Sequence, residues 1–475
     1  MTALSIPTYR FGEAYESLDR IEIADFRTGE ICASVSSVNA GIITRDLRKI
    51  PHSFRSLQRH TTADMIAICK RAAKLFIDGD VKVAEGVTQS PDDYCRLVMT
   101  SGGLPKAVVR SNMKKIALVL TEMASVLRGL TRGLDLCVLD DGIHEQDGLL
   151  VSYRPVAGHL AVVLPSNSPG VNALWLPAIA MRIPVLLKPG QGDPWTPLRI
   201  IAAMIEAGAP PDAFGYYPTD HEGSGVISAE CDRVMLFGDA NTVERYTGDP
   251  RVSVHGPGYS KVLVGDDQVE RWKEHLPVME DSVIMNCGRS CVNASTIVVP
   301  SHASEVAESL AQRLAEYRPM DLDHPEANLA GFMNPDFADA INAQLEAELT
   351  SPGATDVSEE KRQGSRCVDV DGVRYLQPTV VLCEDREHAL AKSEFLFPFA
   401  SVVEVPQDDM LEWIGPTLVA TAITDDSDFR RALIASAEID RLNLGPIATP
   451  IIRWDQPHEG NLFELLYRRR AIQTS

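Results

Sequence analysis

The sequence has no long apolar run and no excess of basic residues. A membrane-spanning helix needs about 18 or more consecutive apolar residues, and the best candidate, VNALWLPAIAMRIPVLLK, is interrupted by Pro177, Arg182 and Pro184. We therefore expect no membrane insertion. The formal net charge is −21, whereas a nucleic-acid or anionic membrane surface requires clustered lysine and arginine. We therefore also expect no nucleic-acid partner.

A secretory signal is also missing from the start of the chain. The segment MTALSIPTYRFGEAYESLDR has no basic stretch followed by an apolar one. The nine cysteines are an odd number scattered along the chain, which favours reduced thiols. We expect a cytoplasmic protein. The 475 residues, 45% of them hydrophobic and 23% charged, are typical of a globular protein with two or three domains.

The first half alternates buried strands with amphipathic helices. Apolar runs predict strands at His159–Pro165, Ile183–Pro189 and Asp232–Phe237. Between them, TPLRIIAAMIEAG predicts a helix with Thr196 as N-cap, Pro197 in the first turn and Gly208 at its end. Strand, helix and strand in this order favour a right-handed crossover and a parallel sheet. The first half is therefore predicted to be an α/β domain of the nucleotide-binding type.

The second half has its own set of strands. Apolar segments begin at Lys261, Ser295, Pro378, Phe399 and Leu418, and SEVAESLAQRLAEY is predicted to be a helix between two of them. This pattern predicts a second α/β domain. The polar stretch SPGATDVSEEKRQGSR is predicted to be a surface loop. We find no internal repeat and no low-complexity segment.

Two cysteines, Cys287 and Cys291, lie four residues apart in IMNCGRSCVNAS. Structural zinc usually needs four ligands in two close pairs, and no second pair of Cys or His is evident, so we expect no metal. A disulfide is disfavoured where thiols stay reduced. Two alternatives stay open on these residues alone. Both cysteines are small core residues, or one of them is a nucleophile.

Several segments resemble signatures of the aldehyde dehydrogenase superfamily. In NCGRSCVNASTIVVP, the residues Gly288, Arg289, Ser290 and Cys291 fall on its active-site pattern, with Arg289 where glutamine is usual. The other matching segments, in chain order, are FRTGEICASV, LPSNSPGVNALWLPAIAMRIPVLLKPGQGDPWTPLRIIAAMIEAGAPPDAFGYY, RYLQPTVV and EFLFPFASVVEV. The resemblance spans nearly the whole chain in the order of the family.

This resemblance implies an α/β fold with three parts. They are a Rossmann-type cofactor domain over residues 1–133 and 156–255, an α/β catalytic domain over 256–440, and a small oligomerisation element over 134–155 and 441–475. In this family the hairpin and the C-terminal tail would join subunits, so we expect a homodimer or a homotetramer.

The resemblance also implies a mechanism. Cys291 would be the nucleophile and Cys287 structural, while the Cys291 backbone N–H and the Asn167 amide would hold the oxyanion. The adduct of a small-molecule aldehyde would pass a hydride to a nicotinamide and leave a thioester on the cysteine. From the residues alone, a turn residue is the alternative for Asn167, because Ser-Asn-Ser-Pro favours turns.

The same resemblance assigns the cofactor residues. They are Pro165, Ser166, Lys188 at the adenosine ribose, Gln191, Gly238 at the pyrophosphate, and Glu394 at the nicotinamide ribose. Gln191 stands where the family has an acid that repels a 2′-phosphate, so both NADP and NAD are expected. Gly238 is followed by Asp239 rather than serine, and an acid is unfavourable beside a pyrophosphate.

A second departure concerns the acyl acceptor. His255 stands where hydrolytic members have a general-base glutamate, and HGPGYSK is similar to a Gly-Pro-Gly segment of fatty acyl reductases in this superfamily. A thiol with a pKa near about 8.5 needs less help from a base than water does. We therefore expect the coenzyme A-linked branch, which interconverts an aldehyde and an acyl-CoA. Two alternatives remain: release of the free acid with His255 as the base, and a non-catalytic scaffold.

Overall fold

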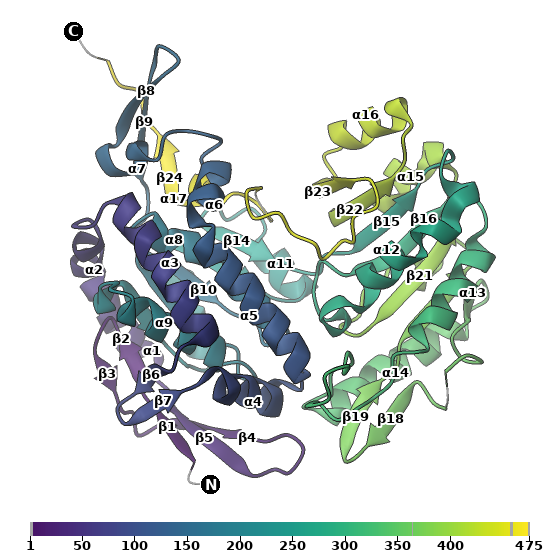
Figure 1. Ribbon diagram of the computed structural model, residues 1–475, viewed down its shortest axis with the longest axis horizontal. Coiled ribbons are helices and arrows are strands. Elements are labelled where there is room, and N and C mark those ends of the chain that lie inside the picture. Colours follow the sequence, from purple (N-terminus) through teal and green to yellow (C-terminus); the bar gives the residue numbers. More distant parts are fainter. Residues whose placement is uncertain (1–2, 363, 457–458, 474–475) are drawn as a thin grey trace. The chain divides into compact units, whose positions relative to one another are not determined.

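The computed structural model describes residues 3–362, 364–456 and 459–473. The chain divides into two compact units (Figure 1). The first unit contains Met1–Ser101, Val109–Gly256 and Arg453–Ser475, and the second contains Gly102–Val108 and Pro257–Ile452. Within the described residues, no helix is both long and apolar enough to cross a membrane.

The first unit is built on a seven-stranded sheet in the order β14-β13-β10-β11-β12-β2-β3. Its strands are β2 (Thr8–Arg10), β3 (Ala14–Tyr15), β10 (Leu160–Val163), β11 (Val185–Lys188), β12 (Phe214–Tyr216), β13 (Arg233–Phe237) and β14 (Val252–His255). The five strands from β10 to β14 pair in parallel. This confirms the three strands predicted from apolar runs, because strands buried on both faces of a parallel sheet are apolar almost throughout.

Helix α9 (Trp195–Glu206) is the helix predicted between two of these strands, but its cap is different. We expected Thr196 to cap it. Instead the Asp193 carboxylate accepts the Thr196 N–H at 3.0 Å and the Thr196 hydroxyl at 2.8 Å. The prediction was wrong because this aspartate, three residues earlier, takes both donors. Gly208, with φ of 105°, follows the helix end as expected.

The remaining helices of the first part of the chain are short or amphipathic. In chain order they are α1 (Ala40–Asp46), α2 (Ile50–Leu57), α3 (Thr62–Asp78), α4 (Pro91–Gly102), α5 (Lys106–Thr121), α6 (Met123–Leu130), α7 (Cys137–Asp141), α8 (Leu176–Ala180), α10 (His221–Glu230) and α11 (Ala240–Tyr246), and α17 (Leu462–Leu466) lies in the tail. Helix α3 begins with a reciprocal hydrogen-bond pair between Thr61 and Asp64, and it packs against α9 (Figure 1).

Three small sheets complete the first unit. They are β1 (Leu4–Ile6), β5 (Ile31–Ser36) and β4 (Arg20–Ala24); β6 (Val81–Ala84) and β7 (Val87–Gln89); and β24 (Tyr467–Arg469), β9 (Leu149–Pro155) and β8 (Ile143–Gln146). In the last sheet the tail strand β24 pairs antiparallel with the hairpin strand β9, as Figure 1 shows. The hairpin and the tail, more than 300 residues apart, therefore form one structural element.

The second unit contains another seven-stranded sheet, in the order β17-β20-β21-β16-β15-β22-β23. Its strands are β15 (Ser260–Val264), β16 (Ala294–Val299), β17 (Ala354–Asp356), β20 (Thr379–Cys383), β21 (Phe399–Glu404), β22 (Thr417–Ile423) and β23 (Ile439–Leu444). All pair in parallel except β17 with β20. The five strands predicted here are confirmed, and β18 (Cys367–Val370) with β19 (Val373–Leu376) forms a separate hairpin.

Helices pack around this second sheet and close its core. They are α12 (Trp272–Ile284), α13 (Ala303–Leu314), α14 (Pro335–Leu349), α15 (Gln407–Ile414) and α16 (Ser427–Ala435). The predicted helix of this region is α13. The polar segment predicted to be a surface loop is partly wrong, because Arg362 and Arg366 are buried and both bind Asp356. Paired charges allowed this polar segment to enter the interior; its residue 363 lies outside the described residues.

Candidate active site

The segment before Cys291 has an unusual backbone. Asn286, Cys287 and Gly288, in the 3₁₀ turn η5 (Met285–Gly288), have φ of 54°, 60° and 65°. Three consecutive left-handed residues are rarely found outside sites where the surroundings hold them. A Cβ on Gly288 would lie 2.4 Å from the Pro398 nitrogen. This close approach requires glycine at position 288 and fixes the path of the chain toward Cys291.

Asn293 holds this segment in place. Its amide nitrogen donates to the carbonyls of Met285 at 2.9 Å and Ser282 at 3.1 Å, and its oxygen accepts the Ser290 N–H at 3.0 Å. Sequence reasoning did not single out Asn293, because a single asparagine two residues after a motif is no signal by itself. Its contacts link the end of α12, the strained turn and the residue next to Cys291.

The two cysteines have different surroundings. Cys287 is buried, and burial raises the pKa of its thiol to about 12. Cys291 is partly exposed and packs beside the small apolar cluster of Val292, Leu418 and Val419. A nucleophile must be reachable and ionisable, so only Cys291 of this pair has the surroundings of a nucleophile. Its predicted role stays a prediction.

Arg289, where the family usually has glutamine, is a buried anchor. Its guanidinium donates to the Gly331 carbonyl at 2.9 Å and the Gly102 carbonyl at 3.2 Å, and lies 4.8 Å from the centre of the Phe332 ring. Burial lowers the pKa of this arginine. Arg289 therefore anchors the segment before Cys291 through hydrogen bonds and a cation–π contact.

Glu394 meets the backbone turn that precedes β15. Its Oε2 accepts the N–H of Gly258 at 3.0 Å and the N–H of Tyr259 at 2.5 Å. The same turn touches Cys291, because a Cβ on Gly258 would lie 1.9 Å from the Cys291 carbonyl oxygen. A carboxylate has about four acceptor positions, and ribose hydroxyls are donors whose hydrogen bonds such a group can accept. The structure brings Glu394 and Cys291 to one turn, and the cofactor role of Glu394 stays a prediction.

In the first unit, four predicted cofactor residues follow adjacent strands. Pro165 and Ser166 come after β10, and Lys188 and Gln191 lie at the end of β11, which pairs in parallel with β10. The Ser166 hydroxyl accepts the Gly192 N–H at 3.0 Å, so the two loops touch. Ligands of open α/β sheets bind at the carboxyl ends of such strands.

The side chains in these loops differ in exposure. Lys188 is half-buried, and burial lowers the pKa of its ammonium. Gln191 is exposed, and Asn167 is half-buried. A half-buried ammonium at a strand end suits a hydroxyl or phosphate acceptor.

Gly238 follows β13 and is crowded by the next helix. A Cβ there would lie 2.4 Å from the Thr242 methyl group. The neighbouring Asp239 caps α11 by accepting the Thr242 N–H at 2.9 Å and its hydroxyl at 2.7 Å, and these hydrogen bonds lower the pKa of the carboxyl. The acid that seemed unfavourable beside a phosphate therefore has a structural partner of its own.

His255, at the end of β14, is paired with an acid from the tail. Its Nδ1 makes a short hydrogen bond with the Glu459 carboxylate, its Nε2 lies 3.2 Å from the Ser253 hydroxyl, and its ring stacks on Phe237. Both members of the pair line a cavity of about 360 Å³ together with Trp454. Sequence reasoning proposed His255 but missed Glu459, which lies 204 residues away.

The features described so far are a strained segment before Cys291 in the second unit, and two touching strand-end loops and the His255–Glu459 pair in the first. Comparison with known proteins shows the family to which the chain belongs. A profile described as "Aldehyde dehydrogenase family" matches residues 20–421. The chain belongs to this family. The predicted superfamily is thereby confirmed, whereas nothing in the comparisons supports the coenzyme A-linked branch.

Two relatives of this chain are distant from it in sequence. It is 24% identical over 312 residues to a betaine aldehyde dehydrogenase of Cereibacter sphaeroides (strain ATCC 17025 / ATH 2.4.3), covering 60% of this chain and 61% of that protein. It is 23% identical over 285 residues to the aspartate-semialdehyde dehydrogenase (non-phosphorylating) of Halomonas elongata, covering 56% and 54%. The match thus spans only about three fifths of these relatives' length.

Solved structures confirm the predicted fold class. The aldehyde dehydrogenase KauB from Pseudomonas aeruginosa superposes with a TM-score of 0.81 at 17% identity, covering 99% of this chain and 96% of that one. An indole-3-acetaldehyde dehydrogenase in complex with NAD+ gives 0.80 at 17% identity, covering 98% and 96%. At this identity the likeness concerns the fold.

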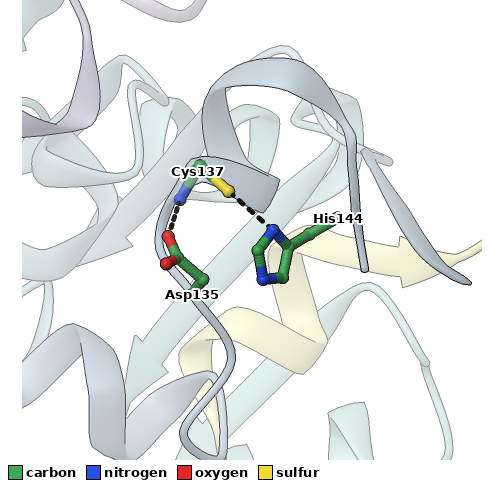
Figure 2. A group of neighbouring side chains, drawn as sticks. All are labelled: Asp135, Cys137 and His144. Carbon is green, nitrogen blue, oxygen red and sulfur yellow. Dashed lines mark hydrogen bonds between the residues drawn. The ribbon is translucent and has the colours of Figure 1, made fainter. Parts of the chain in front are cut away.

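A second cluster of polar side chains, Asp135, Cys137 and His144, lies near the hairpin (Figure 2). Its ligand atoms lie within 4.8 Å of one another. Sulfur and nitrogen on one tetrahedral zinc ion would be roughly 3.5 Å apart, given bonds of about 2.3 and 2.0–2.1 Å. The observed Sγ–Nδ1 separation is 3.1 Å, and Asp135 accepts the Cys137 N–H at 2.9 Å.

The surroundings of the Cys137 thiol disfavour its ionised form. Burial, with the nearby carboxylates of Asp135, Asp141 and Asp140, raises the pKa of Cys137 to about 11. The Cys137 Sγ and the His144 Nδ1 form a hydrogen bond. We interpret the cluster as a hydrogen-bonded turn and assign no metal to it.

Proposed function

We propose that this chain is an NAD(P)-dependent aldehyde dehydrogenase that oxidises a small aldehyde and releases the free acid. The family match and the exposure of Cys291 support the first half of this proposal. The His255–Glu459 pair supports the second half. The relatives described above carry the names betaine aldehyde dehydrogenase and aspartate-semialdehyde dehydrogenase, and neither name refers to coenzyme A.

The residues of this chain divide the reaction into two stages. In the first stage the Cys291 thiolate attacks the aldehyde carbon, and the Cys291 backbone N–H and the Asn167 amide stabilise the oxyanion. When bound, NAD(P)+ supplies the acceptor for the hydride that leaves this adduct. Lys188 and Ser166 in the strand-end loops, and Glu394 beside the nucleophile turn, have the donors and acceptors to hold its riboses. The product of this stage is a thioester on Cys291.

In the second stage water must attack that thioester, and water needs a base. The loss of the family's glutamate at position 255 led us to expect coenzyme A instead. The pairing of His255 with Glu459 weakens that argument, because a carboxylate on Nδ1 holds the imidazole ring in one orientation. His255 would then take the proton from water through Nε2, and the Cys291 thiolate would leave as the acid forms. This pairing is the observation that favours the free acid over the acyl-CoA.

The acyl-CoA product remains a second candidate, favoured by the Gly256–Gly258 segment and by the missing glutamate. One assay separates the two. Purified protein receives an aldehyde and NAD+ or NADP+, with and without coenzyme A, and the products are identified by mass spectrometry. Free acid formed at equal rates in both conditions supports our proposal. A requirement for coenzyme A, with acyl-CoA as product, would refute it in favour of the reductase branch. Failure of Cys291 to react with any aldehyde or thiol reagent would favour a scaffold.

Cofactor choice rests on Gln191, which is neutral and exposed. Because no carboxylate repels a 2′-phosphate there, we propose that both NAD and NADP are accepted. Among the solved neighbours, one is described in complex with NAD+ and another, a 3,6-anhydro-L-galactose dehydrogenase, in complex with NAP. Gln191→Glu is expected to lower kcat/KM for NADP about tenfold or more with little change for NAD. An equal effect on both cofactors would contradict the assignment.

Self-association into a homodimer or homotetramer is part of this proposal. The hairpin and tail, residues 134–155 and 441–475, share the β24-β9-β8 sheet, and Leu149 exposes 67% of its surface at the hairpin. Strand β23 lies partly in the proposed oligomerisation range but belongs to the sheet of the second unit. Light scattering coupled to size-exclusion chromatography would give the mass, and Leu149→Lys is expected to lower it.

A further inference from the structure

The turn before β15 holds a strained residue by both of its backbone polar groups. Tyr259 has φ of 45°, a left-handed conformation that a bulky side chain rarely adopts. Its N–H donates to Glu394 at 2.5 Å, and its carbonyl accepts the Lys261 ammonium at 2.6 Å. Two charged side chains therefore hold this residue in a conformation that it would otherwise leave.

Lys261 is an unexpected residue for its position. It lies in β15, where all five residues are buried, and only 2% of its surface is exposed. Its ammonium also donates to the Thr417 hydroxyl at 3.1 Å. Burial lowers the pKa of Lys261 to about 8, while Glu394 raises it and Lys392 opposes that effect. A buried ammonium is costly unless its hydrogen bonds are used, and here one of them fixes the strained turn.

The same turn contacts the nucleophile segment. The Ser260 hydroxyl donates to the Cys291 carbonyl at 2.8 Å, and the backbone of Gly258 approaches that carbonyl so closely that only glycine fits. The Gly258 carbonyl in turn accepts the Leu418 N–H at 2.8 Å. One turn thus joins Glu394 on one side to Cys291 on the other, within a single compact unit.

We propose that Lys261 is a positioning residue that holds the Tyr259 turn, and through it keeps the Glu394 carboxylate in register with Cys291. It touches neither substrate nor cofactor in this account. The inference rests on the proposed function, because the roles of Glu394 and Cys291 are those assigned there. Lys261 keeps the Tyr259 backbone in its left-handed conformation. If that backbone relaxed, the Tyr259 N–H would move away from Glu394, and one of the two N–H groups that orient the carboxylate would be lost.

The test is a double-mutant cycle on cofactor affinity. Equilibrium dissociation constants for NAD+ and NADP+ are measured by fluorescence titration for wild type, Lys261→Met, Glu394→Gln and the double variant. Methionine keeps the length of the side chain without its charge. We expect Lys261→Met to weaken cofactor binding about tenfold, and to have an effect of less than about twofold once Glu394 is already replaced. Lys273→Met, an exposed lysine of the same unit, is the matched control and should change nothing.

The outcomes discriminate between positioning and simple structural support. Additive effects of the two substitutions, or unchanged affinity in Lys261→Met, would overturn the proposal. So would a Glu394→Gln variant with normal affinity, because Lys261 is proposed to act through that carboxylate. If Lys261→Met does not fold, Thr417→Val removes the second contact of the ammonium and should give a smaller, equally non-additive loss. Because the readout is binding, absence of aldehyde oxidation would refute the proposed function without blocking this test.

Steady-state kinetics gives a second readout that a purely structural role would not move. If aldehyde is oxidised, Lys261→Met should raise KM for the cofactor about tenfold and change kcat by less than about threefold. A variant that is merely less well folded would lower kcat per mole of protein and leave KM unchanged. That pattern would also overturn the proposal.

Discussion

Replacing Glu459 by glutamine tests whether the His255–Glu459 pair drives release of the acid. The two side chains expose only 2% and 8% of their surfaces, so water screens their hydrogen bond little. Glutamine keeps the shape and can still accept from Nδ1, but it removes the negative charge. The perturbation therefore separates the charge of the pair from its geometry, and Glu459→Ala removes both.

The expected size follows from the burial of the pair. A hydrogen bond to a charged group contributes about 1.5–3 kcal/mol, and a neutral one about 0.5–1.5 kcal/mol. Glu459→Gln should therefore cost about 1–1.5 kcal/mol, which corresponds to a roughly tenfold slower deacylation. Glu459→Ala should cost about 1.5–3 kcal/mol, or roughly 10- to 150-fold.

Stopped-flow absorbance of the reduced cofactor measures both stages in one experiment. The burst reports formation of the thioester on Cys291, and the later linear phase reports its hydrolysis. We expect both Glu459 variants to keep the burst and to slow the linear phase. Glu464→Gln is the matched control, because Glu464 lines the same cavity but pairs with Arg132.

Two results would refute this reasoning. If Glu459→Ala hydrolyses the thioester as fast as wild type, the pair is not the base and another group activates water. If the burst is lost in proportion to the linear phase, Glu459 acts on folding or on acylation and not on deacylation.

Three further predictions concern the backbone, the thiols and pH. Gly258→Ala should abolish activity in a folded protein, because a Cβ would lie 1.9 Å from the Cys291 carbonyl oxygen. In the control Gly225→Ala, the new Cβ meets nothing within 4 Å, so activity should be unchanged. Circular dichroism measures whether each variant is folded, and the turnover rate measures its activity. Iodoacetamide at pH 7.5 should label Cys291 and spare Cys287, whose pKa burial raises to about 12, and peptide mass spectrometry that finds Cys287 labelled first would contradict this. Burial raises the pKa of Asp193 to about 6, against about 3.9 in an unfolded chain, so the folded state binds the extra proton. The free energy of unfolding should therefore fall as pH rises from about 4 to 6, by up to about 3 kcal/mol, and urea unfolding of Asp193→Asn should lack this trend.

Much of the fold could be predicted because its signals are local. The strands β10, β11 and β13 are short apolar runs, and helix α9 follows from an apolar face with proline and glycine at its ends. The cysteine segment was recognisable for the same reason, since Gly288 and Cys291 are three residues apart. The error at the start of α9 was also local. Several side chains near a helix start can supply the capping oxygen, and the sequence does not say which one turns toward it.

The sequence by itself thus determined the α/β class, the family resemblance and the identity of the cysteine pair, because each depends on residues close together in the chain. Only the tertiary structure decided which of those side chains meet. Glu459 reaches His255 across 204 residues, Glu394 reaches Gly258 across 136, and Arg289 reaches the Gly102 carbonyl across 187. Such partners follow from how strands are ordered in a sheet and where loops return. No window of sequence contains both ends of these contacts, so the surroundings of His255, of the Gly258 turn and of the segment before Cys291 appear only in the folded chain.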